Sequence, residues 1–260
     1  MTYETLKIES SCTTFIIALN RPDKLNSFNQ QLSTELINVL SLARDDESIR
    51  AIIITGMGRA FSAGQDLQEF EGSNWPKLGA ILQHRYNPIV ELLRTIPKPI
   101  IAAVNGPAAG AGANLALMCD LVIAAEESSL MQAFIHVGLV PDTGGTFILP
   151  RLVGMHQAFR LAALGEKLTA QDAFQLGLVY KVVAGGQLME EAQSMASKLA
   201  LLPTQAIGHL KEALNSSLSH NLFEQLEMEV NLQTKCGETA DFTEGVKSFL
   251  EKRKPHFIGK

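Results

Sequence analysis

The sequence has few cysteines, and the three that it has, Cys12, Cys119 and Cys236, lie far apart. No two of them have the spacing of a metal site, and separated thiols in an odd number are typical of a reducing compartment. We therefore expect free thiols, no bound metal and a cytoplasmic protein. Residues 1–10 are polar and acidic rather than apolar, so we expect no signal peptide.

Long apolar runs and blocks of like charge are also missing. The most apolar stretch, residues 99–125, is interrupted by Asn105, Asn114 and Asp120, whereas a membrane-spanning helix needs a more continuous run. The formal net charge of -5, with both signs interspersed, argues against nucleic acid as the main partner. We therefore expect neither a membrane nor a nucleic acid as partner, and any anionic ligand must be held by local groups.

Several catalytic motifs are absent as well. The sequence contains no Walker loop, no His-Glu-x-x-His zinc motif and no Gly-x-Ser-x-Gly nucleophile elbow. The turn at Gly110 and Gly112 resembles a dinucleotide fingerprint, but Leu115 occupies the position of the third glycine. The sequence thus gives no support to phosphate, zinc, serine-hydrolase or nicotinamide chemistry.

What is present is a chain of 260 residues, 46% of them hydrophobic, which is enough for a large core. Apolar segments typical of buried strands are Thr13–Leu19, Ala51–Thr55, Pro99–Val104 and Asp120–Ala125. Amphipathic segments typical of helices lie between them, at Gln30–Arg44 and Leu78–Thr95. Strands that alternate with helices predict an α/β unit with right-handed crossovers.

The pattern changes after about Gly165, where one helical segment follows another. These segments are Ala170–Leu176, Leu188–Leu201, Thr204–Ser216, Leu222–Lys235 and Glu244–Lys252. We expect an α/β core over residues 1–195 and a helical C-terminal region over residues 196–260. Such a region can pack on its own core or join a neighbouring chain in an oligomer.

Asp142 is the most informative residue, because it lies behind Pro141 and before a glycine-rich turn in an otherwise apolar segment. Apolar surroundings disfavour a charged carboxyl and raise its pKa, which suits proton transfer near neutral pH. Alternatively, Asp142 caps a helix that starts at Thr143. His136 lies nearby and could act as a base, although a histidine in such an apolar run is more often structural.

Three turns rich in small residues follow buried segments: Arg59–Leu67, Asn105–Leu115 and the turn after Asp142. Small residues let two backbones approach closely and leave N–H groups exposed, and a helix start adds a positive dipole. Two such turns that converge would form an oxyanion hole for an enolate. Tight packing of strands on helices also requires small residues, but three successive turns of this kind favour a site.

Four motifs together resemble the crotonase family, the enoyl-CoA hydratase/isomerase superfamily. They are Leu19–Pro22, Phe61–Leu67, Pro97–Gly106 and Gly138–Thr146, which occur in the family's order over essentially the whole chain. The resemblance implies an α/β core of spiral ββα units and a helical C-terminal trimerisation region, with trimers often paired into hexamers. It also implies an acyl-CoA substrate and no cofactor beyond the coenzyme A that the substrate carries.

The resemblance also implies roles for individual residues by motif position. The backbone N–H groups of Gln65 and Ala111 would form the oxyanion hole for the thioester oxygen. Residues that would contact coenzyme A are Ala63, Asp66, Leu67, Phe257 and Lys260. Residues that would line the substrate pocket are Tyr86, Asn114 and Phe134, with Asp142 as the catalytic acid and base.

Two departures from the family pattern bear on the reaction. Hydratases of the family use two glutamates, and those positions hold Asn114 and Phe134 here, neither of which can act as a general acid or base. Asp142 stands where some family isomerases carry a lone catalytic acid. Several segments resemble one branch of the family, which converts ring-1,2-epoxyphenylacetyl-CoA to its oxepin isomer and can shift a double bond in dehydroadipyl-CoA. These segments are Ala63–Leu67, Tyr86–Pro88, Ala108–Ala113, Pro141–Asp142 and the tail Glu244–Lys260.

We therefore expect an acyl-CoA isomerase in which one carboxylate removes a proton and returns it at another carbon. Within the family, the alternative is a Δ3,Δ2-enoyl-CoA isomerase or hydratase-like enzyme of fatty-acid oxidation. Outside the enzymes, the alternative is a non-catalytic scaffold that binds acyl-CoA, which the missing glutamates suggest. Asp142 and the small-residue turns argue against the scaffold.

Overall fold

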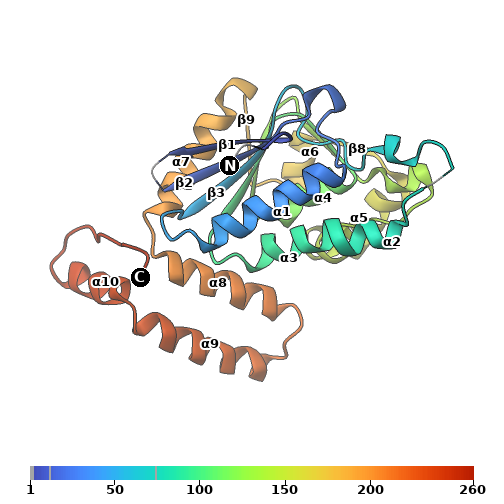
Figure 1. Cartoon of the computed structure of the whole chain (residues 1–260). Helices are drawn as coiled ribbons and strands as arrows, with labels where there is room; N and C mark the ends of the chain where they lie inside the picture. Colours follow the sequence, from blue (N-terminus) through green and yellow to red (C-terminus); the bar gives the residue numbers. More distant parts are fainter. Residues whose placement is uncertain (1–2, 12, 74) are drawn as a thin grey trace.

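The computed structural model describes residues 3–11, 13–73 and 75–260 (Figure 1). The expectations for Cys12 and for the first two residues of the chain therefore lie outside the described residues. The strands are β1 (Leu6–Ser11), β2 (Thr14–Leu19), β3 (Ala51–Gly56), β4 (Ile100–Val104), β5 (Pro107–Ala109), β6 (Leu121–Ala125), β7 (Ser129–Met131), β8 (Lys167–Thr169) and β9 (Lys181–Val183).

The helices are α1 (Gln30–Asp45), α2 (Leu78–Ile81), α3 (Asn87–Thr95), α4 (Ala111–Met118), α5 (Gly145–Leu164), α6 (Ala170–Gln175), α7 (Leu188–Ala200), α8 (Thr204–Ser217), α9 (Leu222–Gly237) and α10 (Ala240–Leu250). Short 3₁₀ helices are η1 (Pro22–Lys24), η2 (Leu67–Phe70), η4 (Ala133–Val137) and η5 (Gly185–Gln187). A π-helical turn, η3 (Leu82–Tyr86), joins α2 to α3. The single helix predicted for residues 78–95 is thus helical throughout but widened in its middle.

Six strands form the main sheet in the order β1-β2-β3-β4-β6-β9, and β5, β7 and β8 form a smaller one. β1 and β2 are antiparallel, whereas the pairs from β2 to β9 are parallel. β3 and β4 are buried along their whole length, as parallel strands covered on both faces must be. The predicted strands correspond to β2, β3, β4 and β6, so the α/β class is confirmed.

The two faces of the main sheet belong to two apolar cores, because side chains alternate along each strand. Ile52 and Ile54 of β3 pack in the core that includes α1 and α3, whereas Ile53 packs in the core beneath α7. In Figure 1, α7 and the pair α1 and α3 lie on opposite sides of the sheet. α1 begins where predicted because the Asn29 side chain caps it, accepting a hydrogen bond from the Leu32 N–H at 2.9 Å.

The C-terminal helices α8, α9 and α10 extend away from the sheet (Figure 1). The expected boundary after residue 195 falls inside α7, whose Ala196 and Ala200 are buried against the sheet, so the extending region begins beyond Ala200. Large apolar side chains that are exposed on these helices are Leu210, Leu214, Leu222, Phe223, Leu226, Val230, Phe242, Val246, Phe249 and Leu250. A surface of this kind is what a subunit interface would cover, and the trimer stays a prediction.

The turns after β3 and β4 are in direct contact, which requires glycine. A Cβ atom at Gly106 would lie 2.2 Å from the Arg59 carbonyl oxygen. One at Gly112, in α4, would lie 2.4 Å from the Ser62 carbonyl oxygen and 2.6 Å from the Ser62 Cβ. Ser62 and Ala108 also form an isolated parallel bridge between the two turns. The backbones are thus locked together at van der Waals distance.

Gly112→Ala tests this contact. The added methyl group cannot be accommodated without moving the turn that contains Ser62, so we expect the free energy of unfolding to fall by about 1–3 kcal/mol. Urea denaturation measures the loss. Gly237→Ala, at the end of α9 where a Cβ would meet no atom within 4 Å, is the matched control and should lose nothing. Equal stability of the two variants would contradict the close approach.

Candidate active site

Two backbone N–H groups point out of the contacting turns without a partner. Gly64 has a φ of 86°, and a Cβ there would lie 3.3 Å from the Ala111 nitrogen. The two turns therefore touch at Gly64, and Gln65 is the next residue in the sequence. Ala111 is the first residue of α4, where a backbone N–H has no acceptor within the helix. Within the described residues, neither the Gln65 nor the Ala111 N–H donates to another backbone carbonyl. These are the two donors expected for an oxyanion hole.

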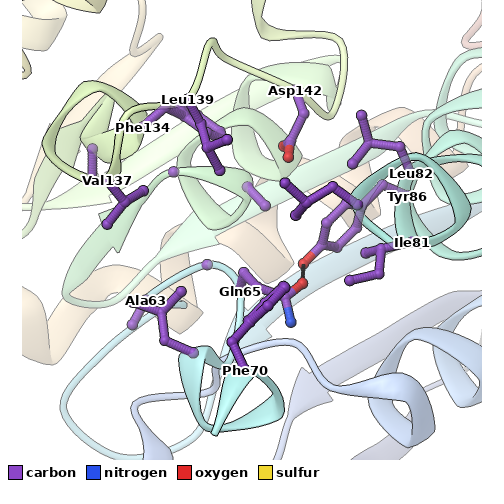
Figure 2. Close-up of a pocket in the computed structure, with 16 residues that line it drawn as sticks. Ala63, Gln65, Phe70, Ile81, Leu82, Tyr86, Phe134, Val137, Leu139 and Asp142 are labelled. Carbon is purple, nitrogen blue, oxygen red and sulfur yellow. Dashed lines mark hydrogen bonds between the residues drawn. The ribbon is translucent and has the colours of Figure 1, made fainter. Parts of the chain in front are cut away.

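A cavity of about 260 Å³ opens over these turns (Figure 2). Its lining includes Gly64, Gly110 and Ala111 from the turns. Its apolar walls are Ala63, Leu67, Phe70, Leu78, Ile81, Leu82, Ala133, Phe134, Val137 and Leu139. Polar side chains among the lining residues come from Gln65, Tyr86 and Asp142. An apolar pocket with a few convergent polar groups is the usual form of a small-molecule site.

Asp142 supplies the only carboxyl group among these lining residues. Figure 2 shows its side chain pointing into the cavity from the side opposite Ala63 and Gln65. Burial among apolar walls raises the pKa of Asp142, and the Thr143 hydroxyl, which donates to Oδ1 at 2.7 Å, partly opposes this rise. The carboxyl is therefore a stronger base than an exposed aspartate, as its apolar sequence context predicts.

The helix-capping alternative for Asp142 is wrong. α5 begins at Gly145 rather than Thr143, its N-cap is Gly144, and no side chain caps it. The Asp142 backbone carbonyl accepts from the Gly145 N–H at 2.8 Å, whereas its carboxyl group accepts from the Thr143 hydroxyl and points into the cavity (Figure 2). Thr143 has a φ of 51°, a conformation that is rare for a β-branched residue and costs about 1–3 kcal/mol. Strain of this kind is found mostly at functional sites.

A hydrogen-bond network holds Gln65 in place beside the cavity. The Tyr86 hydroxyl donates to Oε1 of Gln65 at 2.5 Å (Figure 2), and Nε2 of Gln65 donates to Glu69 at 2.7 Å. Arg85, next to Tyr86 in the π-helical turn, forms an ion pair with the same Glu69 oxygen at 2.7 Å. Burial, and then the charge of Asp142, strongly raise the pKa of Tyr86, so its phenol stays neutral. The network fixes the side chain of Gln65, whose backbone N–H donates to no other backbone carbonyl.

Asp66 was expected to contact coenzyme A, but it does not line this cavity. It is buried, forms an ion pair with Arg21 at 2.9 Å, and caps η2 by accepting from the Gln68 N–H. Its carboxylate is thus occupied in holding the turn that contains Gln65. Ala63 and Leu67, the other two predicted contacts in this turn, do line the cavity.

Phe257 and Lys260 also lie away from the cavity of their own chain. Phe257 lines a separate apolar cavity among α8, α9 and α10, and Lys260 pairs with Glu47 at 2.7 Å. The reason is the Asp241 carboxylate, which accepts from the backbone N–H groups of residues 258 and 259 and so folds the tail back on α10. The role of these two residues in binding coenzyme A stays a prediction.

The two positions that replace the family glutamates have different surroundings. Phe134 lines the cavity as an apolar wall, as expected. Asn114 is fully buried and does not line the cavity; its amide donates to the Asp142 backbone carbonyl at 2.8 Å. His136 also lies outside the lining, with Nε2 at 3.1 Å from the Gly165 carbonyl oxygen, so it is not placed to act as a base there.

The sequence reasoning missed the wall formed by Phe70, Ile81 and Leu82. The helical periodicity of residues 78–95 includes Ile81 and Leu82, but it does not reveal the π-helical turn that directs this segment toward the cavity. Within the described residues, no group of three or more His, Cys, Asp or Glu side chains could hold a metal ion. No helix of the same residues is long and apolar enough to cross a bilayer.

A largely apolar cavity lined by one carboxyl group and by two residues whose backbone N–H groups have no backbone acceptor has the groups needed to remove a proton beside a carbonyl and to stabilise the enolate that forms. The family model for enoyl-CoA hydratase/isomerase matches residues 9–260. The chain belongs to the enoyl-CoA hydratase/isomerase family, the crotonases, and is an enzyme that acts on acyl-CoA thioesters. The resemblance predicted from its four motifs is confirmed.

Similar proteins carry both isomerase and hydratase names. A 1,2-epoxyphenylacetyl-CoA isomerase of Escherichia coli K12 is 44% identical over 247 residues, 94% of each chain. A probable enoyl-CoA hydratase of Rhodobacter capsulatus is 44% identical over 262 residues, 100% of each chain. The structure of an enoyl-CoA hydratase from Bacillus anthracis has a TM-score of 0.92 at 35% identity and covers 99% of this chain and 100% of its own. These likenesses confirm the crotonase fold.

Asp142→Asn should raise the free energy of unfolding at neutral pH. Because burial raises the pKa of Asp142, the folded state binds its proton more tightly than the unfolded chain does. The tighter binding of this proton stabilises the folded state below the pKa of Asp142 in the unfolded chain, which is about 3.9. The stabilisation is lost as the pH rises through the pKa of Asp142 in the folded state. Urea denaturation at several pH values should show that the free energy of unfolding of the variant, relative to that of the wild type, increases as the pH rises.

Asp46→Asn is the control for this measurement. Its hydrogen bonds from Ser48 lower the pKa of Asp46, so replacing this carboxylate should not stabilise the protein at neutral pH. A stability difference for Asp142→Asn that does not change with pH would contradict the burial of the Asp142 charge.

Proposed function

We propose that this protein is an acyl-CoA isomerase in which Asp142 removes a proton from the carbon next to the thioester and returns it to another carbon. The main support is that Asp142 is the only carboxyl group among the lining residues. The residues at the two hydratase positions, Asn114 and Phe134, have no group that can activate water. An isomerisation requires no water in the cavity, and apolar walls exclude it.

In the proposed mechanism, the thioester oxygen accepts hydrogen bonds from the N–H groups of Gln65 and Ala111. Negative charge develops on this oxygen as the α-proton moves to the Asp142 carboxylate, and the two fixed donors stabilise it. The raised pKa of Asp142 makes the carboxylate a better base. The same group, once protonated, delivers the proton to the distant carbon of the extended enolate, so atoms and charge are conserved.

For the substrate, we propose ring-1,2-epoxyphenylacetyl-CoA, which isomerises to the seven-membered oxepin, with a double-bond shift in dehydroadipyl-CoA as a second activity. In the oxepin reaction the ring carbon–carbon bond of the epoxide opens and the α-proton moves to a ring carbon. Support comes from the isomerase relative at 44% identity and from the shape of the cavity. Tyr86 and Ile81, which line one part of the cavity, are each 2% exposed, and this buried wall would suit a compact ring.

We also propose that the chain forms an oligomer. Phe257 and Lys260 would contact the coenzyme A bound by a neighbouring chain, within a trimer or a pair of trimers held by α8, α9 and α10. Support comes from the exposed apolar side chains of these helices. The cytoplasmic location stays a prediction from the cysteine content.

Turnover on two sets of acyl-CoA esters tests the substrate. One set contains the ring epoxide, made in situ by an epoxidase, and the other contains 3-enoyl-CoAs of graded length, with products identified by mass spectrometry and NMR. We expect oxepin formation and slow reaction of long 3-enoyl chains. A preference for long chains would assign the protein to fatty-acid oxidation, and hydration of 2-enoyl-CoAs would assign it to the hydratases.

Asp142→Asn tests the catalytic group. Because the amide cannot accept the α-proton, turnover should fall by about 10²- to 10⁴-fold. Affinity for a non-reactive CoA ester, measured by calorimetry, should change little, since Asp142 lies at the acyl end of the cavity. A variant that keeps most of its turnover would refute the mechanism. Tight ester binding without turnover in the wild type would instead support the scaffold.

A further inference from the structure

A chain of two buried amides lies behind Asp142. Asn114 is 0% exposed and Gln132, which precedes η4, is 5% exposed. Nδ2 of Asn114 donates to the Asp142 backbone carbonyl at 2.8 Å, and Nε2 of Gln132 donates to Oδ1 of Asn114 at 2.8 Å. Neither side chain lines the cavity, so neither contacts a substrate there.

The backbone carbonyl of Asp142 decides which atom of each amide donates and which accepts. A backbone carbonyl can only accept, so Asn114 must present its NH₂ group to Asp142 and its oxygen to Gln132. Gln132 must in turn present its NH₂ group to Asn114. Its own Oε1 is then left without a partner, and it is the only such buried side-chain polar atom among the described residues. An unpaired buried acceptor is destabilising, so the arrangement persists at a cost to stability.

The loop that receives this hydrogen bond has an unusual backbone conformation. Thr143 has a φ of 51° and Gly144 a φ of 73° immediately after Asp142. Gly145 packs on the Asn114 amide so tightly that a Cβ there would lie 2.2 Å from Nδ2. The Asn114 side chain therefore supports the strained turn through both a hydrogen bond and direct packing.

Asn114 also connects the Asp142 loop to the proposed oxyanion hole, because it lies three residues after Ala111 on α4. Residues three apart on a helix are neighbours on the same side. One short helix thus carries the Ala111 N–H that faces the thioester oxygen and the amide that holds the Asp142 loop. The separation between the hole and the base is fixed by this helix rather than by the loop.

We infer that Asn114 and Gln132 form a positioning relay that holds the Asp142 carboxyl at the reacting carbon. The position that serves as an acid or base in the family's hydratases is used here to orient the isomerase acid. This inference rests on the proposed catalytic role of Asp142.

Asn114→Leu tests the relay, since leucine removes the donor without adding a charge. Turnover of the ring epoxide and of a six-carbon 3-enoyl-CoA should fall about 10- to 100-fold at saturation, because a displacement of about 1 Å can cost that much. KM should change by less than about threefold, since the CoA contacts are untouched. The acid limb of the kcat–pH profile should move to lower pH as the released carboxyl gains solvent. Gln132→Met should show the same effects in weaker form.

Thr55→Val is the matched control. The Thr55 hydroxyl donates to the Ala103 carbonyl at 2.8 Å within the sheet, so this variant loses one buried side-chain to backbone hydrogen bond outside the site. Its stability should fall as in Asn114→Leu, but its kcat and pH profile should match the wild type. If Asn114→Leu behaves like Thr55→Val, the relay is merely structural and the inference is wrong.

The double variant Asn114→Leu with Asp142→Asn separates the relay from the proposed function. If Asn114 acts only through Asp142, the double variant should turn over no more slowly than Asp142→Asn alone. A further fall would show that Asn114 acts on the substrate directly and would overturn the inference. Retained turnover in Asp142→Asn alone would instead refute the proposed function, whatever the result for Asn114. Should Asn114→Leu fail to fold, Gln132→Met carries the same test.

Discussion

At three glycines where the turn after β3 meets the turn after β4, no side chain larger than a hydrogen atom fits. A Cβ atom at Gly64, Gly106 or Gly112 would lie less than 3 Å from backbone oxygens of the facing turn. This constraint brings the unpaired N–H groups of Gln65 and Ala111 to the same side of one cavity. The positions of both donors are therefore set by backbone contact, which side-chain motion does not disturb, and preorganised donors are the most effective kind in catalysis.

Much of the core and part of the site could be predicted because their signals are local. The strands around Ile53 and Ile101 are short apolar runs, and Asp142 is a lone acid in an apolar segment. The unusual π-helical turn at Leu82–Tyr86 could not be predicted, since its side chains keep helical periodicity. The role of Asn114 was also hidden: its partners, Asp142 and Gln132, are 28 and 18 residues away in sequence and meet it only in the folded chain.

The C-terminal region shows a different limit of sequence reasoning. The predicted helix at Glu244–Lys252 begins earlier, at Ala240, because Thr239 caps it by accepting from the Phe242 N–H. The tail then folds back because the buried Asp241 carboxylate accepts two backbone N–H groups. Family motifs can assign Lys260 a role in binding coenzyme A, but only the folded chain reveals that the tail is held away from its own cavity.

An apolar cavity that already holds one negative charge disfavours a second carboxylate beside Asp142. In the proposed reaction, Asp142 becomes neutral as it takes the proton, and the negative charge passes to the thioester oxygen between the two N–H donors. The apolar cavity then holds one negative charge at every stage, first on Asp142 and then on the enolate oxygen, because the strongly raised pKa of Tyr86 keeps the phenol neutral. A second carboxylate at position 134 would face the enolate across apolar walls, where repulsion between like charges is strong. In the proposed isomerase, phenylalanine at this position avoids this repulsion.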